Sequence, residues 1–277
     1  MISIKIATAH SAISADVRQN GEHVRGLMKQ AHESGARIIH FSEGALSGYV
    51  KSQIKDWRHV DWRLLLEELD AVARLAGDLR LWVVLGSNHR LTPPHRPHNS
   101  LYVISEQGAL IGRYDKRLCS NTEINDWYTP GFEQFVFEID GLRFGCALCI
   151  EVHFPEIFDA YRRSGVDCVL LSAYTDDPMY GVIGQGHAAI NNIWLSLATP
   201  TNPSTAVRSL LLGPDGNVLG RTEAGRASVI TTVIDTKDAR WEIPLRRARP
   251  WRTSARAGEI YRAQRVEDPR SDDKTRF

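Results

Sequence analysis

Three polar side chains in this sequence stand where a run of apolar, strand-forming residues ends. They are Glu43, Lys116 and Cys149, and each follows or closes such a run. Ligands bind at the strand ends of open α/β sheets, so we expect the three side chains to meet along one edge. A thiol with an ordinary pKa of about 8.5 becomes a useful nucleophile only with a base or a cation beside it. A Glu that takes the thiol proton and a Lys that stabilises an oxyanion would meet that need, so the three residues predict metal-free acyl transfer.

Taken one at a time, these residues have simpler interpretations. Glu43 alone is more typical of a loop acid that caps a turn, and Lys116 alone of a solvated surface charge. A free cysteine is often only a small buried apolar residue. The functional interpretation therefore depends on the combination of the three positions.

The segment around Cys149 favours a nucleophile. Cys149 lies at the end of an apolar run, and Pro155 shortly after it is typical of the first turn of a helix. A tight passage from a strand into a helix exposes a side chain and leaves backbone N–H groups unpaired. We therefore expect the N–H of Ile150 to help hold an oxyanion.

Cys146 and Cys149 also have the CxxC spacing of redox and metal sites. Side chains at positions i and i+3 of a strand point to opposite faces, so the two sulfur atoms are expected to diverge. The other cysteines, Cys119 and Cys168, complete no disulfide framework. Since none of the ten histidines has metal-ligand spacing either, we expect neither a metal nor a cofactor.

The elements that must position these residues alternate between strand and helix periodicity. Strands are predicted at 2–8, 37–41, 81–86, 100–105, 111–114, 135–139, 142–149, 168–172 and 194–199. Helices are predicted at 21–35, 62–75, 156–163 and 186–193, with a hairpin turn at 214–216. This alternation indicates an α/β sheet with covered faces. One domain is expected over 1–245, because no repeat or linker interrupts that range.

The last residues, 246–277, are charged and only weakly periodic. We expect a C-terminal extension that is partly flexible or packs at a subunit interface. Trp251 and Tyr261 are the predicted anchors of this extension.

The composition of the 277 residues excludes several classes of partner. A net charge of +1 gives no electrostatic reason to expect nucleic acid or an anionic membrane surface. No apolar run approaches the roughly 18 residues that a membrane-spanning helix needs. The N-terminus lacks the apolar core and cleavage site of a signal peptide, so we expect a cytoplasmic protein.

The residues around the three side chains resemble characteristic segments of the nitrilase superfamily of carbon–nitrogen hydrolases. The resemblance covers residues 2–234. The segments, in chain order, are FSE and SGY within 41–49, HNS at 98–100 with GRYDKRL at 112–118, and CIEVHFPE at 149–156. Three such segments in this order are a specific signal, whereas any one alone is weak.

The resemblance implies a four-layer α-β-β-α sandwich and a catalytic triad of Glu43, Lys116 and Cys149. In that triad Glu43 acts as general base, and Lys116 stabilises the oxyanion on the way to a Cys149 thioester. A homodimer or a larger homo-oligomer is also implied. Many family members carry a second Glu before an aromatic-x-Pro-Gly segment. Glu123 is the predicted match in this chain, with Asp126 as a competing candidate.

The substrate implied by the resemblance is a small amide. Nitrile hydrolysis, N-acyl transfer from the same acyl-enzyme to an amine, and a scaffold role without turnover are the alternatives. Val152 and His153 stand where carbamoyl amino acid hydrolases often carry Arg, which argues against a carbamoyl amino acid substrate. Glu151 replaces a frequent Asp, and the segment 187–192 lacks the Arg and Glu usual in the family.

Aromatic side chains are expected to line the pocket. Tyr49, Trp127 and Tyr174 are the predicted substrate-binding residues, with core packing as the alternative for Trp127 and Tyr174. The glycine-rich run 181–186 resembles a phosphate-binding loop but lacks the Lys-Ser/Thr ending. We interpret this run as a mobile loop beside the pocket.

Overall fold

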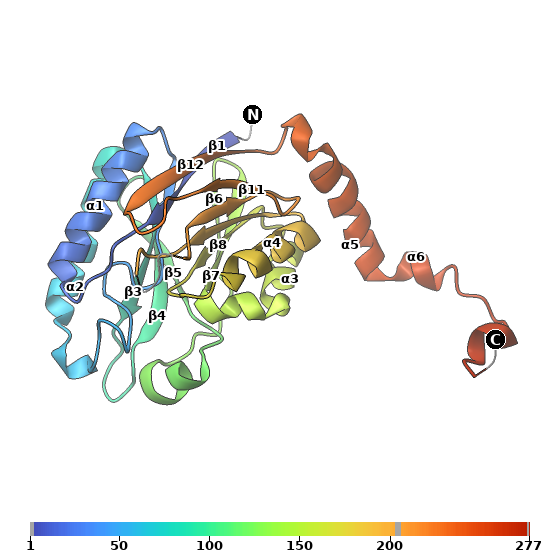
Figure 1. The fold of residues 1–277 in the computed structure, drawn as a ribbon, viewed down its shortest axis with the longest axis horizontal. Coiled ribbons are helices and arrows are strands. Elements are labelled where there is room, and N and C mark those ends of the chain that lie inside the picture. The colour runs from blue at the N-terminus through green and yellow to red at the C-terminus, as the bar shows by residue number, and fades with distance from the viewer. Residues whose placement is uncertain (1–2, 203–205, 276) are drawn as a thin grey trace.

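Two six-stranded β-sheets lie face to face, with a pair of helices on the outer side of each (Figure 1). The structure is a computed structural model that describes residues 3–202, 206–275 and 277. Its four layers confirm the α-β-β-α sandwich expected from the sequence. Ile2, the first residue of a predicted strand, lies outside the described residues.

The first sheet has parallel strands in its centre and antiparallel strands toward its edges. Its order is β12 (Ser228–Asp235), β1 (Ser3–His10), β2 (Ile38–His40), β3 (Trp82–His89), β4 (His98–Ile104) and β5 (Leu110–Asp115). β1, β2 and β3 are parallel to one another. β12 has no counterpart among the predicted strands, because its sequence SVITTVID departs from a simple alternation of apolar and polar residues.

The second sheet repeats this plan. Its order is β11 (Val218–Arg221), β10 (Leu210–Leu212), β9 (Trp194–Ala198), β8 (Cys168–Ser172), β7 (Leu142–Leu148) and β6 (Val136–Ile139). β7, β8 and β9 are parallel, so their carboxyl ends share one edge of the sheet. The predicted hairpin at 214–216 is confirmed, since it joins the antiparallel strands β10 and β11.

Among the described residues, four α-helices cover the sandwich, and three more follow it along the chain. The helices are α1 (Val17–Glu33) and α2 (Trp62–Leu79) over the first sheet, α3 (Pro155–Arg163) and α4 (Met179–Asn191) over the second, and then α5 (Arg249–Ala257), α6 (Glu259–Arg262) and α7 (Pro269–Asp272). α1 begins earlier than predicted, because the side chain of Asp16 accepts a hydrogen bond from the N–H of Arg18 at 2.9 Å and caps a largely polar first turn. Among the described residues, no helix is long and apolar enough to cross a membrane.

Side chains of β7 alternate between two apolar clusters, as a pleated strand requires. Phe144, Cys146 and Leu148 pack in the core between the sheets. Ala147 and Cys149 pack on the opposite side, under α3 and α4. The two cysteines of the CxxC spacing therefore diverge as expected, and both are free thiols.

Polar contacts also cross the core between the sheets. His40 of β2 is fully buried, and its two ring nitrogens lie 2.8 Å from the hydroxyls of Ser196 and Ser172 on the second sheet. The Ser196 hydroxyl also lies 2.8 Å from the hydroxyl of Thr8 on β1. Burial lowers the pKa of His40 from 6.5 to about 3, so this histidine is neutral at ordinary pH.

The expectation of a loop at 181–186 is wrong, because α4 starts at Met179 and contains this run. A Cβ atom on Gly181 would lie 3.1 Å from Leu210, and one on Gly184 would lie 3.4 Å from Leu212. The missing side chains therefore let α4 approach the second sheet closely. Gly181 and Gly184 therefore lie on the packed side of α4, whereas Gly186 has open space at its Cβ position.

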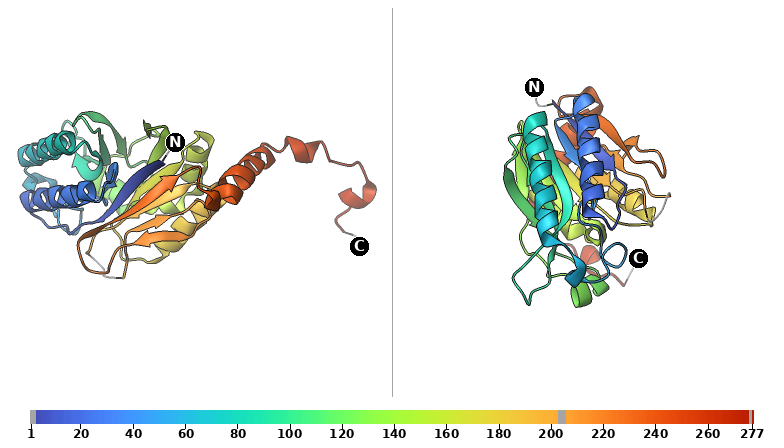
Figure 2. Two further views of the ribbon diagram at one scale, coloured as in Figure 1. Left: turned by 90° about the horizontal axis from the view of Figure 1, so that it is seen from above. Right: turned by 90° about the vertical axis from the view of Figure 1, so that its left-hand side faces the viewer.

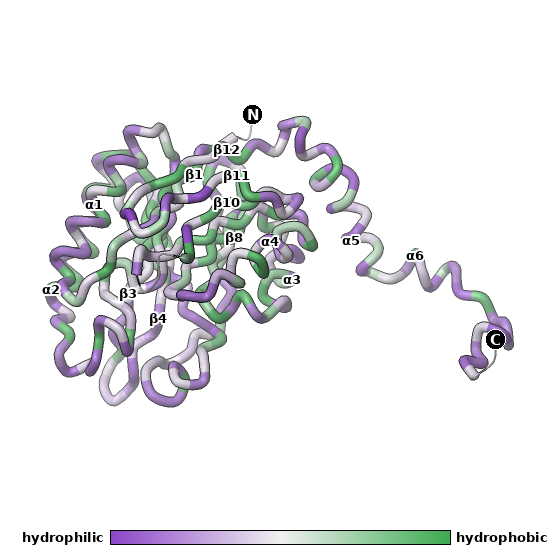
Figure 3. The backbone as a smooth tube through the Cα atoms, viewed as in Figure 1, coloured by the Kyte–Doolittle hydropathy of each residue, from purple (hydrophilic) through white to green (hydrophobic). Residues whose placement is uncertain are grey.

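The C-terminal residues leave the sandwich as a chain of short helices (Figure 2). Hydrophobic residues gather in the segments of the sandwich, whereas this extension is largely hydrophilic (Figure 3). The predicted anchors Trp251 and Tyr261 are both exposed, whereas Arg249 bonds to Asp167 at 3.0 Å and Arg252 to the carbonyl of Ala189 at 2.6 Å. Arginines rather than aromatic residues thus attach the extension to the body of this chain.

Candidate active site

Cys149 lies directly after β7, at the start of a 3₁₀ helix that runs from Cys149 to His153. Its φ angle is 49°, in the left-handed region that non-glycine residues rarely adopt. Pro155 then opens α3 at its first turn. The predicted turn between strand and helix is therefore present, and it directs the thiol away from the core between the sheets.

Three buried charges meet beside this thiol. Nζ of Lys116 lies 3.0 Å from Oε1 of Glu43 and 2.9 Å from Oε1 of Glu123. All three side chains are shielded from solvent almost completely. Asp126, the competing candidate for the second acid, is exposed instead. The structure thus brings Glu123 rather than Asp126 to Lys116.

Glu43 is held by two further hydrogen bonds from separate elements. Oε1 accepts a hydrogen bond from Nδ2 of Asn99 at 2.7 Å, and Oε2 accepts one from the N–H of Tyr174 at 2.9 Å. The carbonyl of Tyr174 is in turn 3.8 Å from Sγ of Cys149. Tyr174 therefore links the proposed base and the proposed nucleophile through its backbone.

The electrostatics of this cluster divide the work between the two carboxylates. Burial raises the pKa of Glu43, and Lys116 opposes that shift without cancelling it. Burial also acts to raise the pKa of Glu123, but Lys116 and the N–H of Ser120 outweigh it, so that the pKa is lowered. Glu43 is thus the acid suited to take up a proton, while Glu123 stays ionised.

The same charges control the ammonium and the thiol. Burial acts to lower the pKa of Lys116, but Glu43 and Glu123 raise it well above its ordinary value, so the ammonium stays charged. Burial, followed by the charge of Glu43, raises the pKa of Cys149 to about 12, and Lys116 opposes this shift. The thiol is therefore protonated at rest and needs a base to remove its proton.

The three aromatic residues predicted to bind substrate have different surroundings. Tyr49 stacks on Tyr174 with ring centroids 4.6 Å apart, and its hydroxyl donates to Glu123 at 3.0 Å. Both tyrosines therefore lie beside the charged cluster. Trp127 packs edge-on against Trp57 at 5.9 Å, within a small apolar cluster on the surrounding loops.

The fold and this arrangement match known enzymes. The family model described as Carbon-nitrogen hydrolase matches residues 5–241. The chain belongs to the carbon–nitrogen hydrolase family. The resemblance to the nitrilase superfamily is thereby confirmed, and with it the assignment of the chain as a carbon–nitrogen hydrolase enzyme.

Several curated relatives of this carbon–nitrogen hydrolase are amidases. Omega-amidase NIT2 of Bos taurus is 21% identical, and the match covers 88% of this chain and 94% of the relative. The 2-oxoglutaramate amidase of Bacillus subtilis is 25% identical over 53% of this chain and 61% of the relative. Among solved structures, an amidase from Nesterenkonia sp. aligns with a TM-score of 0.76 at 22% identity, covering 90% of this chain and 96% of the amidase.

Several residues that support the site of this carbon–nitrogen hydrolase were missed by sequence reasoning. Asn99 contacts Glu43, and the hydroxyl of Tyr180 lies 3.6 Å from Sγ of Cys149. Asn99 belongs to the HNS segment, which was a usable signal. Tyr180 offered none, because its surroundings were assigned to a loop.

Glu151 joins the nucleophile segment to the lysine segment. Its carboxylate accepts hydrogen bonds from the N–H groups of Arg117 at 2.8 Å and Leu148 at 2.7 Å, and from the hydroxyl of Tyr114 at 2.8 Å. Glu151, which stands where the family often has Asp, therefore has a structural role. Since Arg117 directly follows Lys116, these bonds fix the distance between the Lys and Cys segments.

The segment 187–192, which lacks the Arg and Glu usual in the family, has a role in packing through His187. Its ring stacks on Phe158 with centroids 3.8 Å apart, and Nε2 lies 2.8 Å from the carbonyl of Val152. A histidine on α4 thus contacts the turn that carries Cys149. Within the residues that the structure describes, no group of three or more His, Cys, Asp or Glu side chains could hold a metal ion.

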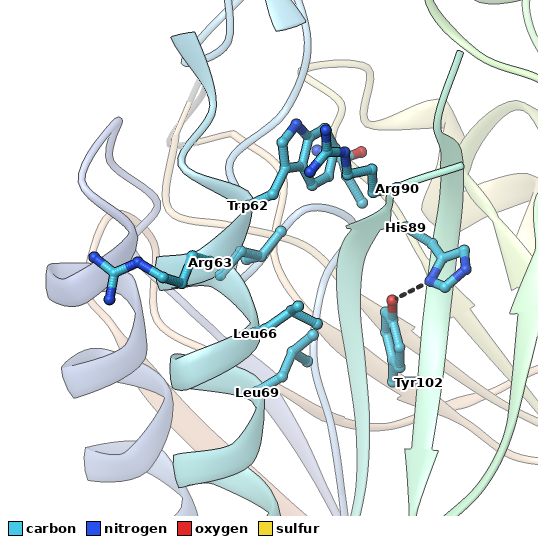
Figure 4. Close-up of a pocket in the computed structure, with 9 residues that line it drawn as sticks. Trp62, Arg63, Leu66, Leu69, His89, Arg90 and Tyr102 are labelled. Carbon is cyan, nitrogen blue, oxygen red and sulfur yellow. Dashed lines mark hydrogen bonds between the residues drawn. The ribbon is translucent and has the colours of Figure 1, made fainter. Parts of the chain in front are cut away.

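A separate pocket of about 440 Å³ lies between α2 and the ends of β3 and β4 (Figure 4). Leu66 and Leu69 form one wall, and Tyr102 and His89 form another, joined by a 2.7 Å hydrogen bond. None of its lining residues belongs to the charged cluster around Lys116. This pocket is distinct from the candidate active site.

Proposed function

We propose that this carbon–nitrogen hydrolase cleaves a small carboxylic amide through a thioester on Cys149. The observation that carries the proposal is the buried ammonium of Lys116, held between Glu43 and Glu123 next to a buried thiol. A site of this kind combines a base, a fixed positive charge and a nucleophile in a medium that excludes water.

In the proposed first half-reaction, Glu43 takes the proton of Cys149 while Sγ attacks the amide carbonyl carbon. The carbonyl oxygen becomes an oxyanion, stabilised by Lys116 and by the N–H of Ile150. The C–N bond then breaks, and Glu43 passes its proton to the departing ammonia or amine. The raised pKa of Glu43 suits both directions of this proton transfer.

In the second half-reaction, water takes the place of the departed amine. Glu43 removes a proton from the water while the water oxygen attacks the thioester carbon. This attack again forms an oxyanion beside Lys116. The carbon–sulfur bond breaks, the acid is released, and the proton returns to Cys149. Glu123 stays ionised throughout and keeps the ammonium in place, as its lowered pKa favours.

A small aliphatic amide is the proposed substrate class. Cys149 is nearly enclosed, with 7% of the residue exposed, which favours a short acyl group. The relatives support this choice, because an amidase from Nesterenkonia sp. AN1 has been solved in complex with butyramide. We expect Tyr49 and Tyr174 to contact the acyl group, and Trp127 to contribute through the apolar cluster that it shares with Tyr49.

The proposal includes a homodimer. Met179, Val182 and Ile190 form an exposed apolar stripe on α4, at a spacing that places them on one face of the helix. Exposed Trp251 of the extension adds a further apolar group. Light scattering should give twice the mass of one chain, and Ile190→Asp should lower that mass toward one chain.

Release of ammonia from a panel of amides and nitriles tests the reaction class. Short-chain amides such as propionamide and butyramide should be hydrolysed by the purified enzyme, whereas the corresponding nitriles should be poorer substrates. Adding hydroxylamine should divert part of the product to a hydroxamate, because a thioester is open to other nucleophiles. Turnover of nitriles alone would contradict the assignment to amides.

A further inference from the structure

The hydrogen bonds of Cys149 point to a further residue in the reaction. Among the described residues, Sγ has two hydrogen-bond partners, the carbonyl of Tyr174 at 3.8 Å and the hydroxyl of Tyr180 at 3.6 Å. A carbonyl can only accept a hydrogen bond, so it cannot stabilise a thiolate. Of the two partners, the Tyr180 hydroxyl alone can donate to sulfur once the thiol has lost its proton.

Tyr180 is fixed in position by its surroundings. It lies in the first turn of α4, where the side chain of Asp177 accepts a hydrogen bond from the N–H of Met179 at 2.9 Å. The ring of Tyr180 is buried and packs edge-on against His153, with centroids 5.3 Å apart. Its neighbour Gly181 lets this end of α4 approach the second sheet. The hydroxyl is therefore directed at Sγ by packing on two sides.

The charges around Cys149 show why such a donor matters. Glu43 and Glu123 both oppose a negative charge on sulfur, whereas Lys116 and the Tyr180 hydroxyl favour one. Lys116 is already hydrogen-bonded to both carboxylates. The contact with Sγ is the one hydrogen bond of the Tyr180 hydroxyl among the described residues, and burial raises the pKa of this phenol, so that it keeps its proton.

We infer that Tyr180 is a catalytic residue that donates a hydrogen bond to the Cys149 thiolate as the proton passes to Glu43. The inference rests on the proposed thioester function. When Sγ attacks the carbonyl carbon, the negative charge moves from sulfur to the carbonyl oxygen, and the hydrogen bond to sulfur weakens. When the carbon–sulfur bond breaks in the second half-reaction, the same hydroxyl stabilises the leaving thiolate. Tyr180 thus assists sulfur both as nucleophile and as leaving group.

Tyr180→Phe removes the hydroxyl and keeps the ring against His153. Hydrogen bonds to charged groups are strong enough that we expect kcat to fall on the order of 10- to 100-fold, with KM changed by less than about threefold. Alkylation of Cys149 by iodoacetamide at pH 8, monitored by mass spectrometry, should be about tenfold slower than in the wild type. A role in packing alone predicts the opposite sign, because a loosened site exposes the thiol and speeds its alkylation.

Tyr102→Phe is the matched control, because Tyr102 is also 7% exposed and its hydroxyl contacts only His89 among the described residues (Figure 4). This variant should keep the wild-type kcat and alkylation rate, and both variants should unfold at similar temperatures. Suppose that iodoacetamide labels Cys149 and that the Tyr180→Phe variant is alkylated and turns over substrate at the wild-type rates. The inference is then overturned, and the proposed function stands. If Cys149→Ala retains full turnover, the proposed function itself fails.

Discussion

Nζ of Lys116 lies 3.0 Å from Oε1 of Glu43, and at most 1% of either side chain is exposed to solvent. An ion pair so deeply buried contributes little to stability compared with an apolar pair of the same shape, yet removal of one partner is costly. In the proposed mechanism the pair places a fixed positive charge beside Glu43, the proposed base.

Replacement of Lys116 by Met should impair both catalysis and folding. Loss of the main oxyanion donor should lower kcat by on the order of 10²–10³. Two carboxylates left without their cation should cost about 3–5 kcal/mol of unfolding free energy. Ammonia release and urea unfolding measure the two effects. Lys5→Met, at the partly exposed end of β1, is the control and should change kcat and the unfolding free energy only slightly. A Lys116→Met enzyme with near-normal kcat would exclude Lys116 as the oxyanion donor.

Glu123→Gln and Asp126→Asn form a matched pair that separates the two candidates for the second acid. Glu123 contacts Lys116, Tyr49 and the N–H of Ser120, whereas Asp126 is exposed. Glu123→Gln should lower kcat at least about tenfold, because a neutral amide no longer holds the ammonium in place. Asp126→Asn should leave kcat unchanged. The reverse order of effects would assign the role to Asp126.

Gly86→Ala should disturb the segment that carries Glu43. A Cβ atom at Gly86 would lie 2.1 Å from the carbonyl oxygen of Ser42 and 3.0 Å from Cα of Glu43. Since both obstacles are backbone atoms, the segment must shift, at a cost of about 1–3 kcal/mol and with a larger loss of kcat. Gly186→Ala is the control, because no atom lies within 4 Å of its Cβ position and alanine favours the helix by up to about 1 kcal/mol. Equal effects of the two substitutions would refute this explanation.

Stability should decrease in mild acid because of His40. Its pKa is lowered from 6.5 to about 3 in the folded state, so the unfolded chain binds the proton more readily. The contribution of His40 is fully present above pH 6.5 and is lost as the pH falls toward 3, at up to about 1.4 kcal/mol per pH unit. His40→Gln should flatten this slope in urea unfolding between pH 6 and 4. Substitution of the exposed His23 by Gln is the control and should not change the slope of stability against pH. If His40→Gln also leaves that slope unchanged, the acid sensitivity comes from another group.

Much of the candidate site could be predicted because strand ends are visible in a sequence. The apolar runs before Glu43, Lys116 and Cys149 correspond to β2 and β5 of the first sheet and β7 of the second, and the face-to-face packing of the two sheets brings the ends of these strands together. Glu123 was predictable only through the family segment that follows it. Its geometry depends on a short helical turn, Glu123–Trp127, that has no periodic signal.

Other parts of the structure depend on packing that a single sequence does not reveal. Tyr180 reaches Cys149 because α4 begins seven residues earlier than its apolar periodicity indicates, starting at Met179 instead of 186. The glycines that permit this close approach are typical of loops elsewhere. The role of Trp127 is similar, since only the structure shows its contact with Trp57.

Capture of the acyl-enzyme shows directly whether Cys149 carries the acyl group during turnover. Wild-type enzyme should be mixed with butyramide, quenched in acid during turnover and digested for peptide mass spectrometry. We expect one butyryl group on Cys149, assigned by fragmentation of the peptide that also contains Cys146 and labile to hydroxylamine as a thioester is, and none on Cys119, Cys146 or Cys168. Active enzyme that carries the acyl group on another residue, or Cys149→Ala enzyme that still hydrolyses the amide at the wild-type rate, would contradict this expectation.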